Sequence, residues 1–485
     1  MKALIYAAAA LCVGLSFASC DDDDDDYFDS GNQGRQISVS RVFLEDCESS
    51  VPDREVSFAR VGQMIRLEGS GFYGMKKVYI NGYDTYFNRA YVSDNSMLVT
   101  INAKTPVTDA DADVRDKIRL VKDKTETTVD FTIRAASPAV SGMSCTLPTA
   151  GETVFVYGEN LHEVKSVTLP DGQVLTEGLA SDDKDGEWFS FVMPAECSAG
   201  GHVYFEGANG QGATPPYFNY VKGMILNFDG TGAQGSWGSS NKDDEGNIKA
   251  GVSMVYPEDL VDDPAQTGRG LCAPIVPKRL LDEGGVASGK PRATEIWTAG
   301  NDDAADDWGR MVTGDEFITA ETPAAELAFQ FDVYAPEAWS GTGYVEVLLI
   351  NNYNFAGIGS DDDRDGNYTA FCVPWVEDGE VVPFKTDGWR TVTIPFSSIT
   401  AEEVKPSVSG VFGGLFDKTF QDIVDARNSA SYRNFGMGFV NTDFEMGSLE
   451  VVSEKFTGPS VYVDNWRVVN IKGVTISDYP EPTDN

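Results

Sequence analysis

Regular alternation of apolar and polar residues in the C-terminal half of the chain predicts β-strands. In the segment 327–333 every second residue is apolar, which places those side chains on one face of an extended strand. The same period of two recurs in 345–349, 392–396 and 435–439. Helical periodicity is scarce, and the segment 420–426 predicts at most one short helix. This half of the chain is therefore expected to form a sandwich that buries one face of each strand.

An internal repeat divides the middle of the chain into two modules. The segment 62–72 (GQMIRLEGSGF) aligns without a gap with 151–161 (GETVFVYGENL), 89 residues later. An offset of that size is the length of a whole domain. Short alternating segments separated by Gly, Asn and Asp indicate an antiparallel sandwich in each copy. In each copy a strand is expected to end at a glycine, and Phe72 or Leu161 to fill the corner after the turn.

The N-terminus is typical of an exported chain. Met1-Lys2 is positive, and the apolar run 3–15 is too short for a membrane span but suits a signal peptide. Six consecutive aspartates, Asp21 to Asp26, repel one another and are expected to stay solvated as a tether. The chain is thus predicted to be all-β, with six segments: signal peptide 1–19, acidic tether 20–36, two tandem antiparallel sandwich domains 37–135 and 136–222, a larger jelly-roll-like β-sandwich 223–475, and a tail 476–485.

The charge and the cysteine usage exclude several classes of partner. The formal net charge is −39, so nucleic acid, anionic lipid surfaces and polyanionic ligands would be repelled, which leaves neutral ligands. The cysteines are widely spaced and form no disulfide framework, although Cys145 and Cys197 share one predicted domain and their pairing stays open. With only two histidines and no close cysteine pairs, zinc and haem are not expected.

Seven of the eight tryptophans lie after Met224, several of them in Gly/Asp/Asn-rich loops. Aromatic rings presented by loops suit sugars, because a ring covers the apolar C–H face while Asn, Asp and Gln bond the hydroxyls. The predicted glycan-binding residues are Trp237, Trp297, Trp308, Trp339, Tyr353 and Trp375. Trp188, Trp389 and Trp466 are predicted to be packing residues instead.

Several motifs resemble those of known families. The sequence Phe17-Ala-Ser-Cys20 resembles the lipobox of bacterial lipoproteins, which implies a lipid on Cys20, and the acidic run after it resembles the surface-export signal of Bacteroidetes lipoproteins. The turn that ends each repeated strand resembles IPT/TIG Ig-like domains. The segments DGWRTVTIP (387–395) and VYVDNW (461–466) resemble strands of jelly-roll carbohydrate-binding domains. In such domains two acidic residues often hold a structural calcium, which implies Asp229 and Asp464 here; no other cofactor is expected.

The layout of the whole chain resembles the surface glycan-binding proteins of Bacteroidetes polysaccharide utilisation systems. That resemblance implies an outer-membrane, cell-surface, lipid-anchored protein whose last domain binds a neutral plant β-glycan such as xyloglucan, mixed-linkage glucan or mannan. It also implies a TonB-dependent importer and a surface glycanase as partners, and no enzyme activity of its own. Two alternatives stay open: a surface adhesin or structural partner of an outer-membrane complex, and a surface glycoside hydrolase, for which two suitably spaced carboxylates would suffice.

Overall fold

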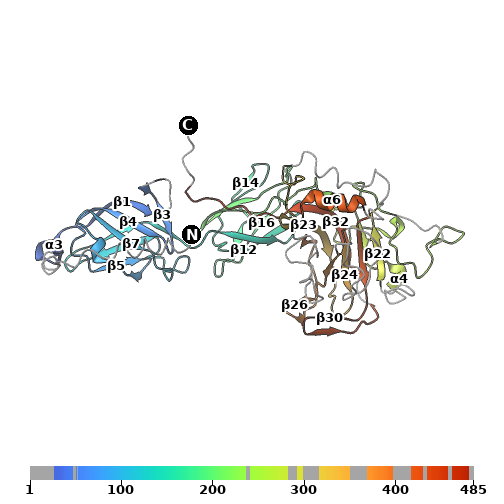
Figure 1. The fold of residues 1–485 in the computed structure, drawn as a ribbon. Coiled ribbons are helices and arrows are strands. Elements are labelled where there is room, and N and C mark those ends of the chain that lie inside the picture. The colour runs from blue at the N-terminus through green and yellow to red at the C-terminus, as the bar shows by residue number, and fades with distance from the viewer. Residues whose placement is uncertain are drawn as a thin grey trace, which may run out of the picture. The chain divides into compact units, whose positions relative to one another are not determined.

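The chain divides into two compact units (Figure 1). The first unit combines Met1–Ser137 with Ala208–Gly210 and Ser477–Asn485, and the second combines Pro138–Gly207 with Gln211–Ile476. The computed structural model describes residues 27–46, 51, 53–235, 241–281, 292–298, 316–349, 369–396, 417–429, 434–456 and 461–479. Strands dominate this part of the chain, which confirms the all-β prediction. No helix within it is long and apolar enough to cross a membrane.

The first module is an Ig-like sandwich with its own apolar core. One sheet has the order β2-β1-β4-β7 and the other the order β6-β5-β8-β9, while β3 and β10 form a parallel pair. The bounds are β1 Ser38–Glu45, β2 Arg54–Glu55, β3 Phe58–Arg60, β4 Met64–Ser70, β5 Lys77–Ile80, β6 Tyr83–Thr85, β7 Ser96–Thr100, β8 Lys117–Val121, β9 Glu126–Asp130 and β10 Thr132–Arg134, with the short helices α3 Ser30–Gly34 and η1 Arg89–Tyr91. The core of this module draws only on residues from Tyr27 to Ile133.

The second module repeats this arrangement. Its sheets have the orders β11-β12-β16-β15 and β14-β13-β17-β18. The bounds are β11 Ala139–Met143, β12 Thr153–Glu159, β13 Ser166–Thr168, β14 Val174–Leu175, β15 Ala180–Ser181, β16 Trp188–Val192, β17 Tyr204–Gly207 and β18 Gly210–Ala213. In both modules the first pair of strands carries a register shift at the same place, between Val39 and Arg41 and between Val140 and Gly142.

The repeated turn has the same physical cause in both modules. A Cβ on Gly69 would lie 1.8 Å from the carbonyl oxygen of Ser38, and a Cβ on Gly158 would lie 1.9 Å from that of Ala139, so both positions require glycine. Two residues later the backbone has positive φ in each copy, at Gly71 and Asn160. Phe72 and Leu161, which follow these positions, are buried as predicted.

The C-terminal sandwich, from Met224 to Asn470, consists of two larger sheets. One has the order β20-β21-β32-β23-β28, with β19 also paired to β32, and the other has the order β22-β29-β24-β25. The bounds are β19 Met224–Leu226, β20 Val261–Asp262, β21 Leu271–Pro274, β22 Arg292–Trp297, β23 Leu327–Tyr334, β24 Tyr344–Leu348, β25 Thr369–Cys372, β28 Arg390–Pro395, β29 Gly436–Val440 and β32 Tyr462–Asn470, with hairpins β26–β27 (Val376–Glu377, Glu380–Val381) and β30–β31 (Phe444–Met446, Leu449–Val451) and the helices η3 Pro257–Asp259, α4 Lys278–Leu281, η4 Ala324–Glu326 and α6 Phe420–Ser429. The four alternating segments are strands, and the predicted short helix is α6.

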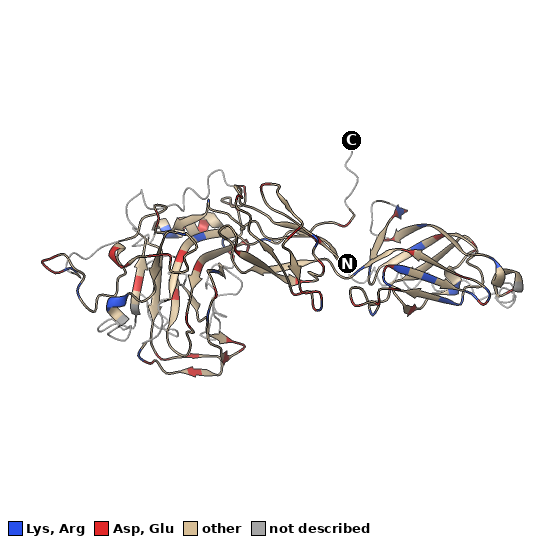
Figure 2. Cartoon of the chain, turned by 180° about the vertical axis from the view of Figure 1, so that it is seen from behind, with Lys and Arg blue, Asp and Glu red and all other residues tan. Residues whose placement is uncertain are grey.

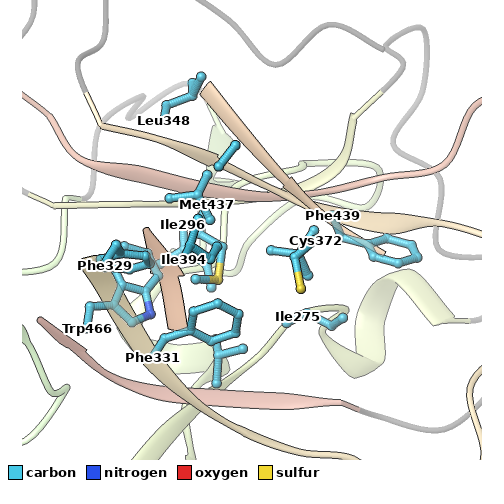
Figure 3. Close-up of a cluster of buried hydrophobic side chains, with 14 of the residues drawn as sticks. Ile275, Ile296, Phe329, Phe331, Leu348, Cys372, Ile394, Met437, Phe439 and Trp466 are labelled. Atoms are coloured by element: carbon cyan, nitrogen blue, oxygen red, sulfur yellow. The ribbon is translucent and has the colours of Figure 1, made fainter. Parts of the chain in front are cut away.

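Facing side chains of the two sheets form the core of this sandwich (Figure 3). Phe329 and Phe331 of β23 and Ile394 of β28 come from one sheet, while Met437 and Phe439 of β29 come from the other. Each of these side chains is at most 2% exposed. Burial of this kind stabilises the fold by roughly 1.5–3 kcal/mol for each large side chain.

The second module packs directly on the C-terminal sandwich. Ala328 of β23 and Val469 of β32 belong to the apolar core of the second module. Because Phe329 faces the interior of the sandwich, its neighbour Ala328 projects from the opposite face. Strand β23 is therefore buried on both faces, whereas alternation alone predicted burial of one.

A buried polar network, the joint, links the same two parts. Arg269 and Asp332 form an ion pair at 2.6 Å with side chains only 5% and 1% exposed. Thr391 donates its hydroxyl to the other oxygen of Asp332 at 2.7 Å. From the second module, Thr146 donates its N–H to Thr391 Oγ1 at 2.9 Å and accepts a bond from the guanidinium of Arg467. Buried charges are tolerated only when paired in this way, so the joint fixes how these two parts pack.

Candidate functional site

Three of the predicted glycan-binding tryptophans lie in the core of the sandwich. Trp297, Trp339 and Trp375 are 4%, 2% and 0% exposed. A ring without an open face cannot stack on a sugar, so the prediction of these three as platform residues is corrected. Trp297 is the last residue of β22, and its ring fills the space over Gly436, where a Cβ would lie 2.4 Å from it. The ring of Trp339 packs against Phe439 and Phe456, and the ring of Trp375 packs against Phe444.

Each of these indoles has a hydrogen-bond partner inside the protein. Trp297 Nε1 donates to the carboxylate of Glu295 at 2.8 Å. Trp339 Nε1 donates to the carbonyl of Thr342, and Trp375 Nε1 to that of Gly343, both at 2.8 Å. A buried indole N–H that is already satisfied is the mark of a packing residue.

Two of the three tryptophans predicted to be architectural, Trp389 and Trp466, are buried packing residues. Trp389 is 2% exposed and donates to Asp263 at 2.9 Å, with the guanidinium of Arg269 5.4 Å from its ring centre. Trp466 is fully buried on β32 against the ring of Phe329. Trp188 is half-buried at the start of β16.

The remaining candidates, Trp237, Trp308 and Tyr353, lie outside the described residues and stay predictions. Their segments, however, begin from described residues that lie together. Gln234 forms a β-bridge with Thr298, and the N–H of Gly235 donates to the carbonyl of Trp297 at 2.7 Å.

The strand that leads to Tyr353 ends at the same place. Trp297 of β22 and Leu348 of β24 are the register partners of Gly436, the first residue of β29, from its two sides. The described residues that precede the segments 236–240, 299–315 and 350–368 therefore lie at one end of the four-stranded sheet.

That end of the sheet is held by buried polar contacts. Asn434 donates its side-chain amide to the carbonyl of Thr298 at 2.7 Å, and the Thr298 hydroxyl accepts the N–H of Phe435 at 2.9 Å. Nearby, Glu295 accepts a bond from the hydroxyl of Ser253 at 2.5 Å. Strands and their hydrogen-bonded ends are more rigid than loops. This end of the sheet is therefore expected to be rigid.

Asp229 and Asp464, the predicted calcium ligands, both accept hydrogen bonds from backbone N–H groups. Both carboxylate oxygens of Asp229 accept the N–H of Leu271 at 3.0 Å. Burial, with the nearby charge of Asp332, raises the pKa of Asp464 to about 8, and Asn465 donates its N–H to this carboxyl. No group of three or more His, Cys, Asp or Glu residues in the described ranges is arranged to hold a metal. Calcium takes roughly six to eight oxygen ligands, which this pair does not supply. The structural calcium stays a prediction.

The two cysteines of the second module are not bonded to each other. Cys145 and Cys197 are free thiols, so the pairing left open by the sequence is absent from this structure. The Cys145 sulfur lies 3.0 Å from a guanidinium nitrogen of Arg269, inside the joint. Sequence reasoning missed the joint altogether, because no spacing along the chain marks its residues.

The chain is similar to a family of known sequence and to several solved structures. Residues 218–470 match the family model of the surface glycan-binding protein B xyloglucan binding domain. The surface glycan-binding protein PbSGBP-B from Prevotella bryantii has a similar fold, with a TM-score of 0.57 and 15% identity over 90% of this chain and 99% of its own. SGBP-B from a complex xyloglucan utilization locus in Bacteroides uniformis aligns over 89% of this chain and 99% of its own, at 17% identity and a TM-score of 0.41.

A relative from Bacteroides ovatus, an IPT/TIG domain-containing protein, is 27% identical over 170 residues, or 35% of this chain. The chain spans about a third of the length of that relative. The match agrees with the IPT/TIG turn seen in both modules. Because the family model covers more than half of the chain, the protein belongs to the surface glycan-binding protein B family.

Proposed function

We propose that this protein is held at the outer face of the outer membrane by a lipid on Cys20 and binds a neutral β-glycan on its C-terminal sandwich without cleaving it. Xyloglucan is the first candidate, because the family model that matches this sandwich is a xyloglucan binding domain. A solved mixed-linkage glucan locus SGBP-B from Bacteroides ovatus was crystallised with a mixed-linkage heptasaccharide, which makes that glucan the second candidate.

The observation that supports this proposal concerns the described residues just before the segments that contain Trp237, Trp308 and Tyr353. All of these preceding residues lie at the Gly436 end of one sheet. Stacking of a flat ligand face on an aromatic ring contributes about 1–3 kcal/mol for each ring. Two or three rings together would give a dissociation constant of roughly micromolar to millimolar order.

The binding test uses the mature full chain and soluble polysaccharides. We expect retarded migration in native gels that contain xyloglucan, weaker retardation with mixed-linkage glucan or mannan, and no release of reducing sugar. Release of reducing sugar would favour the hydrolase alternative. Binding to no glycan, together with capture of an outer-membrane protein, would favour the adhesin alternative.

Alanine variants locate the site within the sandwich. We expect Trp308→Ala, Tyr353→Ala and Trp237→Ala each to weaken binding of xyloglucan by about fivefold to a hundredfold, the equivalent of about 1–3 kcal/mol. Tyr86→Ala is the matched control, because Tyr86 is 81% exposed on the first module and we expect it to have no effect. Unchanged affinity in all three variants would place the glycan site elsewhere.

The anchor and the partners need separate experiments. We expect Cys20→Ser to abolish incorporation of labelled fatty acid and to release the chain from the membrane fraction. Sensitivity of the wild-type protein to protease added to intact cells would test its surface exposure. Co-purification from cross-linked cells tests association with a TonB-dependent importer and a surface glycanase.

A further inference from the structure

Three aromatic rings lie together on the outer face of one sheet of the second module. They are Phe155 and Tyr157 of β12 and Trp188 of β16, and together they are called the aromatic face here. The rings of Phe155 and Tyr157 are 6.3 Å apart and within 10° of parallel, and the ring of Trp188 meets Phe155 edge-on at 5.4 Å. Tyr157 is 40% exposed, and Val192 beside this group is 43% exposed. The group is a patch of apolar surface in contact with solvent.

These rings do not contribute to the core of the module. Their neighbours Val154 and Val156 point inward and are fully buried, and alternation along β12 sends Phe155 and Tyr157 outward. Gly142 is the register partner of Tyr157 on β11, and a Cβ at Gly142 would meet nothing within 4 Å. The space beside Tyr157 is therefore open.

The first module provides an internal control for this face. The 89-residue offset places Arg66 and Glu68 where the second module has Phe155 and Tyr157. Ser96 pairs with Glu68 just as Trp188 pairs with Tyr157. Arg66 is ion-paired with Glu68 and with Glu45. The same fold thus accepts charged residues at these positions, so packing does not explain the aromatic rings.

The charge of the surrounding module restricts the ligand. Residues 136–222 contain three Lys or Arg against eleven Asp or Glu, whereas residues 37–135 contain fourteen against fifteen. Figure 2 shows Lys and Arg on the strands of the first module, while the strands of the second are mostly without charge. An acidic surround repels anionic ligands.

A neutral sugar chain suits a surface of exposed aromatic rings with an acidic surround. Aromatic rings cover the C–H faces of sugars, and this group offers the partly exposed rings of Phe155, Tyr157 and Trp188 for such contacts. The exposed Thr153 and the phenol of Tyr157 supply hydroxyls at the rim. We propose that the aromatic face is a second glycan-contacting surface, which binds a further stretch of a chain already held by the C-terminal sandwich.

This inference rests on the proposed function, and the joint explains how the two surfaces cooperate. The second module is bonded to the sandwich through Thr146 and Arg467, so both surfaces belong to one unit. Once one stretch of a polysaccharide is bound, the next stretch reaches the aromatic face at high effective concentration. Long chains therefore gain from the second surface, and short oligosaccharides do not.

The test transplants the outer face of the first module onto the second. In the full chain, the triple variant F155R/Y157E/W188S carries residues that this fold already accepts at the equivalent positions. We expect the affinity for xyloglucan polysaccharide to fall about fivefold to a hundredfold, and the affinity for a xyloglucan oligosaccharide of one repeating unit to stay unchanged. Tyr204→Ser, which removes a 45% exposed tyrosine from the other sheet of the same module, is the matched control and should change neither affinity.

The outcomes separate the two proposals. If the wild-type chain binds neither probe, the proposed function fails. If the wild type binds both probes and the triple variant binds the polysaccharide equally well, the aromatic face is not a glycan surface, and a protein partner becomes its remaining use. If the triple variant has a lowered melting temperature, the single variant Tyr157→Thr decides: a selective loss of polysaccharide affinity supports the proposal, and unchanged affinity overturns it.

Discussion

The two Ig-like modules share a fold but differ on two faces. The core of the first contains only its own residues, whereas the core of the second takes in Ala328 and Val469 of the C-terminal sandwich. The outer sheet face of the first carries the ion-paired Arg66, and the same face of the second carries aromatic rings. One sequence repeat has therefore produced a module with a core of its own and a module whose core is shared with the C-terminal sandwich.

The largest expected difference lies between the buried ion pair of the joint and the surface ion pairs of the first module. Asp332→Ala leaves the buried Arg269 with only the more distant Glu152 carboxylate, 3.7 Å away, and removal of one member of a buried pair costs about 3–5 kcal/mol of unfolding free energy. Arg66→Ala removes surface ion pairs of the first module, one of them with the 77% exposed Asp53, and should cost about 1 kcal/mol or less. Chemical denaturation of both variants measures the difference. Equal losses would mean that the joint is no stronger than a surface pair.

Substitution of either glycine of the repeated turn should cost a similar amount of stability. This comparison tests whether both modules depend on the same turn. Gly69→Ala and Gly158→Ala each place a Cβ less than 2 Å from a carbonyl oxygen of the neighbouring strand. The backbone must shift to relieve that contact, and we expect each variant to lose about 1–3 kcal/mol of stability. Melting curves of the two variants check this. A large loss in one and none in the other would show that the modules do not share this turn.

Local patterns in the sequence were sufficient for the strands and the repeat, because alternation and glycine turns depend on near neighbours. The resemblance of 387–395 and 461–466 to strands of jelly-roll carbohydrate-binding domains identified Trp389 and Trp466 as packing residues. Local patterns failed for Trp339 and Trp375, whose Gly- and Asp-rich surroundings indicate loops. Whether a loop folds back over a ring depends on distant partners, such as Phe384, which forms a β-bridge with Trp339.

Local sequence patterns could not predict the joint either, because its residues are far apart in the sequence. Arg269 and Asp332 are 63 residues apart, and Thr146 and Arg467 are 321 apart. In a chain with 76 acidic residues, nothing local distinguishes Asp332 from the carboxylates that face water. Its partners Arg269, Thr391 and Asn465 are all distant from it in the sequence.

The smallest expected effect is a difference in labelling rate between two thiols. The labelling rate of Cys145 reports whether the joint opens. Cys145 is 3% exposed beside Arg269, and burial raises the pKa of its thiol to about 11, while Cys197 of the same module is half-buried. Because the thiolate is the reactive form, we expect a thiol reagent at pH 8 to label Cys197 quickly and Cys145 slowly, as followed by peptide mass spectrometry.

The rate at Cys145 should then follow opening of the joint. Asp332→Ala is expected to accelerate labelling of Cys145 and to leave that of Cys372 unchanged, because Cys372 lies in the interior of the sandwich, where burial raises its thiol pKa to about 12. Acceleration at both cysteines would indicate loosening of the whole unit. Equal and rapid labelling of Cys145 and Cys197 in the wild type would mean that the second module separates freely from the sandwich, and it would remove the main difference between the two modules.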